Sequence, residues 1–504
     1  MYTFSKSLKN TALVLMILGL AGIVYGFLST PNSIEEVEKI VAASHHGGHK
    51  VEATAHNTHE AQAKHEVEKE IAETPVIEKV VEAKTDSISK SETDSTKVAV
   101  APVVEEKIES SHNEKTSEET AVDSEKEHKE HVEHVFHQLQ NKPWAALYVA
   151  CIFFMLVSLG ALAFYAIQQV AQAGWSPVLF RVMQGITAYL PIGSILFLLI
   201  LIVTGTHVFH SNNLFVWMKE GVTEVGNANY DKLIAGKSGY LNVTFWLIRA
   251  IIFLAGWNLY RYLSRKNCLA QDESNDNTFY KKNFKMSAAF LVFFIVTESI
   301  MSWDWLMSFD PHWFSTLFGW YVFASFFVSG ITTISMVTLY LKSKGYLENV
   351  NSSHIHDLSK FMFGISVFWT YLWFSQFMLI WYANIPEEVT YFKFRIEYYN
   401  LPFFGAVVMN FIFPILVLIN TDFKRIAPII VGAGVVILCG HYIDFFNMVM
   451  PATVGDQWFI GASEIGSVLF FLGLFIFVVF TALTKVPLTP KRNPFIEESK
   501  HFHY

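Results

Sequence analysis

The sequence predicts an all-α protein that crosses a membrane about ten times. Of its 504 residues, 52% are apolar, 45 are phenylalanine, and the mean hydropathy is +0.32. This composition is typical of a polytopic membrane protein and argues against a soluble globule. The three cysteines lie far apart, so neither a disulfide framework nor a cysteine metal site is expected. No basic patch with interleaved aromatic residues occurs, which argues against a nucleic-acid partner.

The first apolar run covers residues 11–29 and follows a short head that carries Lys6 and Lys9. A signal peptide is one interpretation, but the run is long for one and no clear A-x-A cleavage site follows it. We therefore expect residues 1–30 to form the first transmembrane helix.

Residues 31–140 differ sharply in composition from the rest of the chain. They contain 25 acidic and 12 basic residues, and Phe136 is their only aromatic residue. Such a segment buries too little apolar surface to offset its ordering entropy, so we expect it to be mostly disordered. Eleven of the 19 histidines lie here, and His131, His134 and His137 follow each other at steps of three. They could bind a metal on a helix face, but no carboxylate–histidine pattern fixes a geometry, so we expect a solvated tether and no metal site.

Residues 141–485 are expected to form a nine-helix membrane core, followed by a tail over 486–504. Residues 125–140 contain good helix formers and are expected to extend the second helix outward, and Pro191 is a candidate kink in the third. Each apolar run exceeds the roughly 20 residues that a bilayer requires. The expected helices lie near 143–172, 177–209, 239–263, 283–306, 313–342, 358–383, 398–420, 425–449 and 460–484.

The basic residues predict the orientation. Lys and Arg gather in alternate short loops and in the tail, whereas the loops at 307–312 and 450–459 have none, and those at 210–238 and 384–397 hold a few. The positive-inside rule then places both termini in the cytoplasm and residues 31–140 in the periplasm of a bacterial inner membrane.

The stretch from Glu298 to Tyr321 concentrates polar groups between two apolar runs. Glu298, Asp304, Asp310 and His312 occur there among four tryptophans. Ionised carboxylates near the hydrocarbon are costly and usually have a function, and tryptophans favour the membrane–water boundary. Asp310 before a proline favours a turn. We expect a helix–turn–helix corner whose protonatable groups point into a bundle; the alternative is a capped corner without chemistry.

His441 and Asp444 form a second candidate, three residues apart on one predicted helix. This spacing places both side chains on one face, within reach of a common site. An imidazole beside a carboxylate suits proton transfer. The alternative is a buried pair that only holds helices together.

Further polar residues lie in or beside the predicted spans. Gln376 is in the middle of a helix, and Glu387 lies just beyond the end of that helix, at its periplasmic mouth. Arg249 lies about ten residues into its span, so it should pair with an acid, either Glu298 or Asp304.

A b-type haem would need axial histidines within the membrane. Only His207 and His441 lie at suitable depths, so no haem is expected in this chain. No P-loop, GxSxG, HExxH or CxxCH pattern occurs either.

Two stretches, SWDWLMSFDPHWFSTLFGWYVFASFF and FSQFMLIWYANIPEE, closely resemble signature stretches of a known family. The family is quinone-binding subunit 2 (ActF) of alternative complex III, a quinol:cytochrome c oxidoreductase, and it is similar to the NrfD-type membrane anchors of polysulfide reductases. The likeness covers roughly residues 143–485. It implies two four-helix bundles, formed by helices two to five and six to nine, with peripheral helices around them.

The resemblance also implies partners and a role. The subunit would carry no intrinsic cofactor, with menaquinol or another quinone as a candidate ligand. Haem c and iron–sulfur clusters would belong to an iron–sulfur subunit and to multihaem and monohaem c-type cytochromes. A sister NrfD-like subunit and a cytochrome oxidase supercomplex are further implied partners. The chain would support quinol oxidation, proton translocation or both, without being catalytic alone. A purely structural anchor and a secondary transporter are the alternatives.

Overall fold

The computed structural model describes residues 1–46, 116–209 and 211–503. Within these ranges ten helices are long and apolar enough to cross a membrane, which confirms an all-α polytopic membrane protein. The segment expected to be disordered lies mostly outside the described residues, at 47–115. Its two flanks are described, and both are helical.

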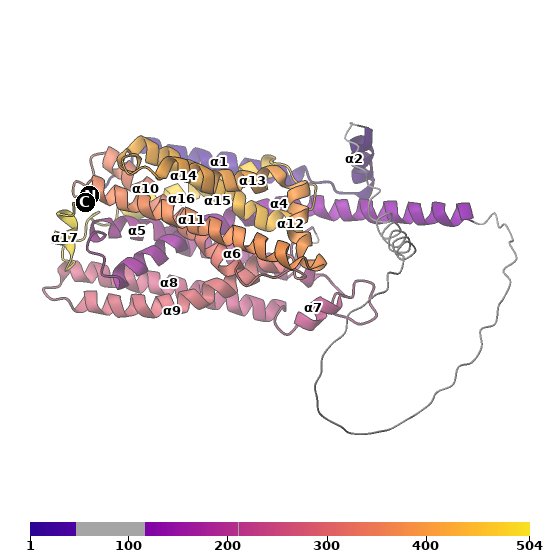
Figure 1. Cartoon of the computed structure of the whole chain (residues 1–504), viewed down its shortest axis with the longest axis horizontal. Helices are drawn as coiled ribbons and strands as arrows, with labels where there is room; N and C mark the ends of the chain where they lie inside the picture. Colours follow the sequence, from indigo (N-terminus) through magenta and orange to yellow (C-terminus); the bar gives the residue numbers. More distant parts are fainter. Residues whose placement is uncertain (47–115, 210, 504) are drawn as a thin grey trace, which may run out of the picture. The chain divides into compact units, whose positions relative to one another are not determined.

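The spanning helices follow the expected order (Figure 1). Short helices between or beside them are α2 (Ile34–His46), α7 (Lys232–Lys237), α12 (Pro386–Tyr398) and α17 (Ile496–Lys500). The ten spans are α1 (Lys6–Leu28), α4 (Thr116–Val170), α5 with α6 (Phe180–Ile186, Leu190–Gly205), α8 (Val243–Glu273), α9 (Thr278–Trp305), α10 (Phe318–Ser343), α11 (Ser352–Ala383), α13 with α14 (Asn400–Val407, Phe413–Leu418), α15 (Ala427–Thr453) and α16 (Ala462–Leu483).

Two spans are interrupted. A 3₁₀ turn at Thr187–Tyr189 separates α5 from α6, two residues before Pro191, the candidate kink. A π-helical segment at Val408–Ile412 separates α13 from α14, directly before Pro414. The two breaks lie in the third and eighth spans. These are the second span of the group from two to five and the third span of the group from six to nine, so their positions do not correspond.

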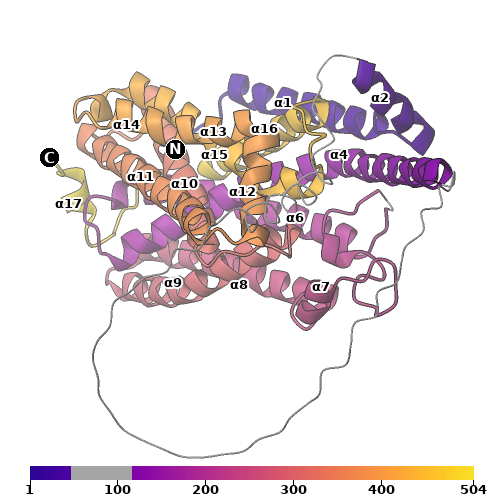
Figure 2. The same ribbon diagram turned by 45° about the vertical axis from the view of Figure 1, so that its right-hand side comes forward.

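The chain divides into two compact units, residues 33–133 and the rest. In the larger unit, α8 packs against α6 and α9, α10 packs against α11 and α15, and α13 packs against α15. Figure 2 shows α8 and α9 along one edge and α13 and α14 along the opposite edge. We call the second to fifth spans the first bundle and the sixth to ninth spans the second bundle, and α1 packs against α16.

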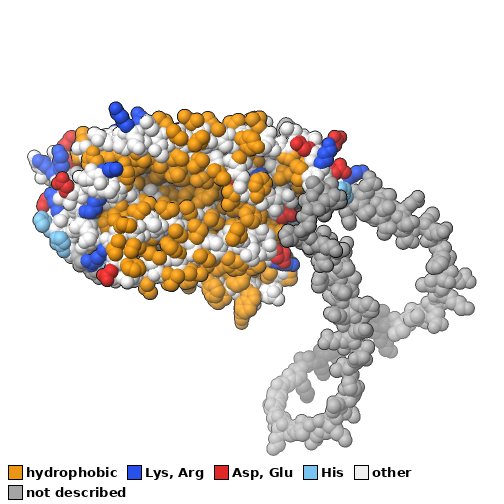
Figure 3. Space-filling view, turned by 90° about the horizontal axis from the view of Figure 1, so that it is seen from above, with side chains coloured by type: hydrophobic (Ala, Val, Ile, Leu, Met, Phe, Trp, Pro, Cys, Tyr) orange, Lys and Arg blue, Asp and Glu red, His pale blue; other side chains and the backbone are white. Residues whose placement is uncertain are grey.

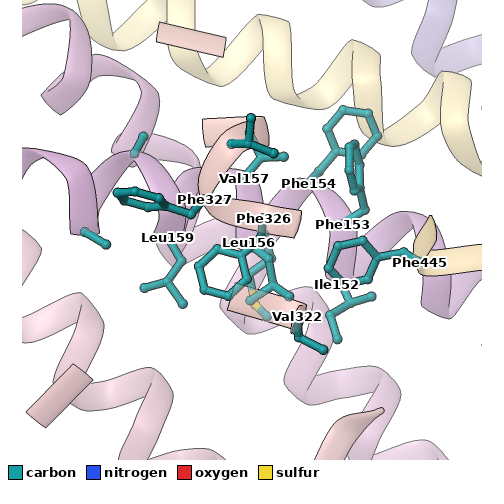
Figure 4. Close-up of a cluster of buried hydrophobic side chains, with 14 of the residues drawn as sticks. Ile152, Phe153, Phe154, Leu156, Val157, Leu159, Val322, Phe326, Phe327 and Phe445 are labelled. Carbon is teal, nitrogen blue, oxygen red and sulfur yellow. The ribbon is translucent and has the colours of Figure 1, made fainter. Parts of the chain in front are cut away.

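The centre of this unit is formed by α4 and α10, whose most apolar stretches are 94% and 89% buried. Their backbones touch at two glycines. A Cβ atom on Gly160 would lie 2.5 Å from the Phe326 carbonyl oxygen, and one on Gly330 would lie 2.6 Å from the Ala161 nitrogen. Only glycine allows this approach. Phenylalanines fill the space beside the crossing, with Phe153 of α4 close to Phe445 of α15 (Figure 4).

The outer surface matches a membrane environment. In Figure 3, hydrophobic side chains cover the middle of the helices, and charged side chains gather near their ends. We call the end that carries α7, α12 and the Asp310 turn the corner end, and the end that carries α17 the tail end (Figure 1). The tail itself is fixed at its end of the unit, because the Asp272 carboxylate accepts from the Lys491 backbone N–H at 2.9 Å.

The corner itself forms as expected. Helix α9 ends at Trp305, a 3₁₀ turn covers Met307–Phe309, and α10 begins at Phe318. On the other bundle, α11 ends before Asn384, whose backbone is left-handed (φ 48°), and Pro386 begins α12. Helix α12 therefore returns over the corner end.

Candidate functional site

His441 and Asp444 lie together, fully buried, near the corner end of the second bundle. Their side chains share one face of α15, as the spacing predicts, but the imidazole Nδ1 and the carboxylate Oδ2 are 3.9 Å apart, too far for a direct hydrogen bond. Ser325 of α10 bridges them. Its hydroxyl donates to Asp444 Oδ2 at 2.7 Å and lies 2.9 Å from His441 Nδ1.

The Asp444 carboxylate also accepts hydrogen bonds from α11 and from a second residue of α10. Trp369 Nε1 of α11 donates to Oδ2 at 2.8 Å, and the Tyr321 hydroxyl of α10 donates to Oδ1. Three protein donors thus replace the hydrogen bonds that water would give a carboxylate. His441 Nε2 is buried and has no hydrogen-bond partner among the described residues. The arrangement is a short relay from imidazole to hydroxyl to carboxylate to phenol.

Helix α10 supplies this site because it is buried all round yet carries a hydroxyl residue at nearly every turn. Some hydroxyls bond back to the helix: Ser329 donates to the Ser325 carbonyl at 2.7 Å. Others are buried without a partner among the described residues, namely Thr332, Ser335 and Thr338. Buried polar groups of this kind are normally satisfied, often by ordered water. The unpartnered hydroxyls continue from the site toward the tail end.

A cavity of about 20 Å³ adjoins the carboxylate. This volume holds about one or two water molecules. Its polar lining includes Tyr321, Gln376, Arg395, Asp444 and Asn447, beside several aromatic rings. Gln376, predicted as a candidate from its depth, is therefore brought to the same site as Asp444.

Arg249 pairs with Asp304, one of its two expected partners. Its Nε lies 2.6 Å from Oδ2 and its Nη2 lies 2.9 Å from Oδ1, a bidentate geometry with both groups buried. Glu298 has no such cation. The residue is 2% exposed, and within the described part of the chain its carboxylate accepts from Ser299 and Ser302, each at 3.3 Å.

His312 does not point into a bundle, contrary to the expectation for the corner. Its side chain is 46% exposed, and its Nε2 lies 2.6 Å from Oδ2 of Asp231. Asp231 caps α7 by accepting from the Leu233 and Ile234 backbone N–H groups. The Ile234 hydrogen bond, and then the neighbouring imidazole, hold the pKa of Asp231 below its usual range. This contact joins the 207–242 loop to the corner, which explains why the imidazole turns outward.

Two other candidates also lie apart from the relay. His207 follows α6, is exposed, and has a left-handed backbone (φ 48°). Glu387 is exposed in the first turn of α12, where the helix dipole favours a negative charge. His207 is thus exposed, whereas His441 is buried within α15.

A second buried polar cluster, which the sequence analysis missed, lies at the tail end of the first bundle. Arg181 pairs with Asp272 at 2.6 Å and bonds Gln184 at 3.0 Å. Gln184 and Asn283 each donate to the Tyr165 hydroxyl oxygen, at 3.2 and 3.0 Å. Arg181 lies only four residues into its predicted span, so its depth did not identify it as the depth of Arg249 did.

Comparison with known proteins gives no match to a family model and none to a curated protein. Among the described residues, no group of three or more His, Cys, Asp and Glu side chains is placed to hold a metal ion.

Proposed function

We propose that the chain is a proton-handling membrane subunit of a quinol-oxidising respiratory complex of the alternative complex III type. The observation that carries this proposal is the buried relay of His441, Ser325, Asp444 and Tyr321, with a water-sized cavity beside the carboxylate. A carboxyl group and an imidazole joined by a hydroxyl can pass a proton without a large movement. The buried, unpartnered hydroxyls on α10 provide positions for water between this site and the tail end.

The size of the cavity favours protons over quinol at this site. Sites for small molecules usually have volumes of about 300–1,000 Å³. The cavity beside Asp444 is about 20 Å³. A water molecule fits there, whereas a quinol ring would require the aromatic lining to move.

A second candidate function, quinol binding, is favoured by a neighbouring groove. This apolar groove has a volume of about 260 Å³ and lies between the end of α11 and α12. Phe392 lines both the groove and the cavity beside Asp444. A quinol ring in the groove would therefore lie one side chain away from the proton relay.

The remaining parts of the proposal follow from the resemblance and the charge pattern. We place the chain in a bacterial inner membrane with both termini in the cytoplasm, so that the corner end faces the periplasm. Its partners would be an iron–sulfur subunit, c-type cytochromes and a sister membrane subunit, which hold the redox centres. The chain itself would contribute proton transfer and would not be catalytic alone.

The test uses the assembled complex with Asp444→Asn or Ser325→Ala, reconstituted in liposomes. We expect the number of protons released per electron to fall, while the haem content of the complex stays unchanged. A structural anchor predicts unchanged proton release and turnover for both variants. Solute uptake by the isolated chain in liposomes would instead support a transporter, and binding of a quinol analogue lost on Phe377→Ala would support the groove.

A further inference from the structure

Arg395 of α12 is a buried cation that has no carboxylate partner among the residues that the structure describes. Three arginines of the described chain are deeply buried, and two of them pair with an aspartate: Arg249 with Asp304 and Arg181 with Asp272, each with a 2.6 Å contact. Arg395 is 4% exposed, and the partners found for it within the described residues are two backbone carbonyls and one ring. A buried charge is costly unless it is compensated, so this exception requires an explanation.

The contacts that hold Arg395 are neutral. Its Nε donates to the Asn447 carbonyl at 3.1 Å, and its Nη1 donates to the Tyr391 carbonyl at 2.9 Å. The guanidinium carbon lies 3.3 Å from the centre of the Tyr391 ring, which itself stacks on Trp313. A cation over an aromatic face is stabilised, but less than by a carboxylate.

Two carboxylates lie on either side of this arginine, each on a small cavity that Arg395 also lines. The cavity of about 20 Å³ is lined by Asp444, and one of about 10 Å³ at the corner is lined by Asp310. Arg395, Tyr391 and Met448 line both cavities and so separate them. The pKa of Tyr391, whose ring lies at both cavities, depends on all three charges. Burial raises this pKa, Arg395 lowers it, and Asp310 and Asp444 both raise it.

We propose that Arg395 is an electrostatic gate that moves between Asp444 and Asp310, which rests on the proposed role of Asp444 in proton transfer. When Asp444 has lost its proton, its negative charge attracts the guanidinium into the inner cavity. When Asp444 takes a proton, that attraction ends and Arg395 returns toward Asp310 at the corner. The arginine side chain is long and already lines both cavities, so a small rotation of its guanidinium shifts it from one carboxylate toward the other.

The gate controls the exchange of protons between Asp444 and the corner end. When a proton leaves Asp444 toward the corner end, the ionised carboxylate remains. Its negative charge attracts the guanidinium of Arg395. The guanidinium then lies between the outer water and the carboxylate, and its charge repels a returning hydronium ion. Arg395 is therefore a positioning residue, which acts through Asp444 and does not itself carry the proton.

The charged and titratable groups around Asp444 come from three helices. His441 lies on α15, Tyr321 on α10, and Tyr391 and Arg395 on α12, while α11 contributes Trp369 and Gln376, which do not titrate. Arg395 is the only permanent cation in this set. Its removal should therefore change the pH at which Asp444 loses its proton.

The test compares Arg395→Gln with Arg395→Lys in the complete complex. The protonated carboxyl of Asp444 is followed by its infrared band, identified by its absence in Asp444→Asn. Without the cation, we expect Asp444 to keep its proton to a pH about one unit higher, because a nearby positive charge favours the carboxylate. Arg395→Lys should restore most of the wild-type titration. Lys393→Gln is the matched control, because it removes an exposed positive charge from the same helix, and its titration should be unchanged.

Two further measurements make the result decisive. Asp310→Asn removes the outer partner, so Arg395 should stay nearer Asp444 and the band should titrate at lower pH. Passive proton leak through liposomes that contain Arg395→Gln should rise several-fold over the Lys393→Gln control. The gate is refuted if the infrared band of Asp444 titrates in Arg395→Gln as it does in the wild type. It is also refuted if the proton leak of Arg395→Gln equals that of the Lys393→Gln control. If proton release is unaffected by Asp444→Asn while the band still responds to Arg395→Gln, the proposed function fails but the coupling of the two residues stands.

Discussion

The ion pair of Arg249 and Asp304 allows a test of which buried carboxylate serves stability and which serves chemistry. Both contacts of the bidentate pair are short, 2.6 and 2.9 Å, and the Asp304 side chain is fully buried. Loss of one partner leaves an uncompensated charge inside the bundle. We expect Arg249→Met or Asp304→Leu alone to lower the free energy of unfolding by about 3–5 kcal/mol.

The double variant should behave differently from the sum of the single ones. Replacing a buried ion pair with apolar side chains of similar size is often neutral, so Arg249→Met with Asp304→Leu should lie within about 1 kcal/mol of the wild type. The coupling between the two positions then amounts to several kcal/mol, which only residues in direct contact produce. Arg249 also contacts the Tyr240 ring at 4.0 Å and its carbonyl at 3.1 Å, and these contacts reduce the cost of losing Asp304.

The assay is the thermal midpoint of the purified complex, followed by the fluorescence of the buried tryptophans and by the fraction that stays monodisperse after heating. Proton release per electron is measured on the same samples well below that midpoint. We expect the double variant to fold and to release protons as the wild type does. A double variant whose loss of stability equals the sum of the two single losses would refute the stabilising role of the pair. If the double variant folds but releases no protons, Asp304 carries protons as well. Asp304 would then not differ from Asp444 in serving stability alone.

Three further predictions follow from single contacts. Ser325→Ala removes the hydroxyl between the imidazole and the carboxylate, and should slow proton release roughly tenfold or more without loss of assembly; stopped-flow release with a pH indicator measures it, and an unchanged rate contradicts the relay. Asp231 has a lowered pKa when folded, so its contribution to holding the 207–242 loop is complete above about pH 4 and is lost as the pH falls through the folded value. Proteolysis of that loop should therefore begin at acid pH, and in Asp231→Asn it should be fast and independent of pH; equal pH dependence in both proteins would exclude this carboxylate. Gly330→Ala should lower the free energy of unfolding by about 1–3 kcal/mol because its Cβ meets backbone at 2.6 Å, whereas Gly364→Ala has no atom within 4 Å and serves as the matched control; equal thermal midpoints would contradict the close approach of the two central helices.

The sequence predicts the spans well because each one must satisfy a length and a composition that the bilayer sets. Their interiors are harder to predict. The depth of Arg249 shows that it needs an acid, but Glu298 and Asp304 lie on the same helix six residues apart, and only packing decides between them. Similarly, the spacing of His441 and Asp444 shows a common face but not the serine that joins them. That serine comes from a helix more than a hundred residues earlier in the chain.

The burial of Arg395 could not be predicted from the sequence. In the sequence it is one of a few basic residues in a connection that begins with a proline and two glutamates, and such a charge is normally solvated. Its burial follows from the return of α12 over the corner end, which depends on the left-handed Asn384 and on the ring of Tyr391. The burial of this side chain thus depends on the tertiary path of the chain and not on its local composition.

Asp304 and Asp444 show why residue type and depth are weak guides to function. Both are buried aspartates near the corner end, one in each bundle, and each accepts short hydrogen bonds. Asp304 is bound by a guanidinium through two contacts, which holds its charge and its position together. Asp444 is bound by neutral hydroxyl and indole donors, adjoins a water-sized cavity, and has its nearest arginine held by other groups. A carboxylate that must gain and lose a proton needs the second environment, because a fixed cation would keep it charged. The distinction therefore lies in where the two arginines are held, and exchanging the partners of the two aspartates should exchange their roles.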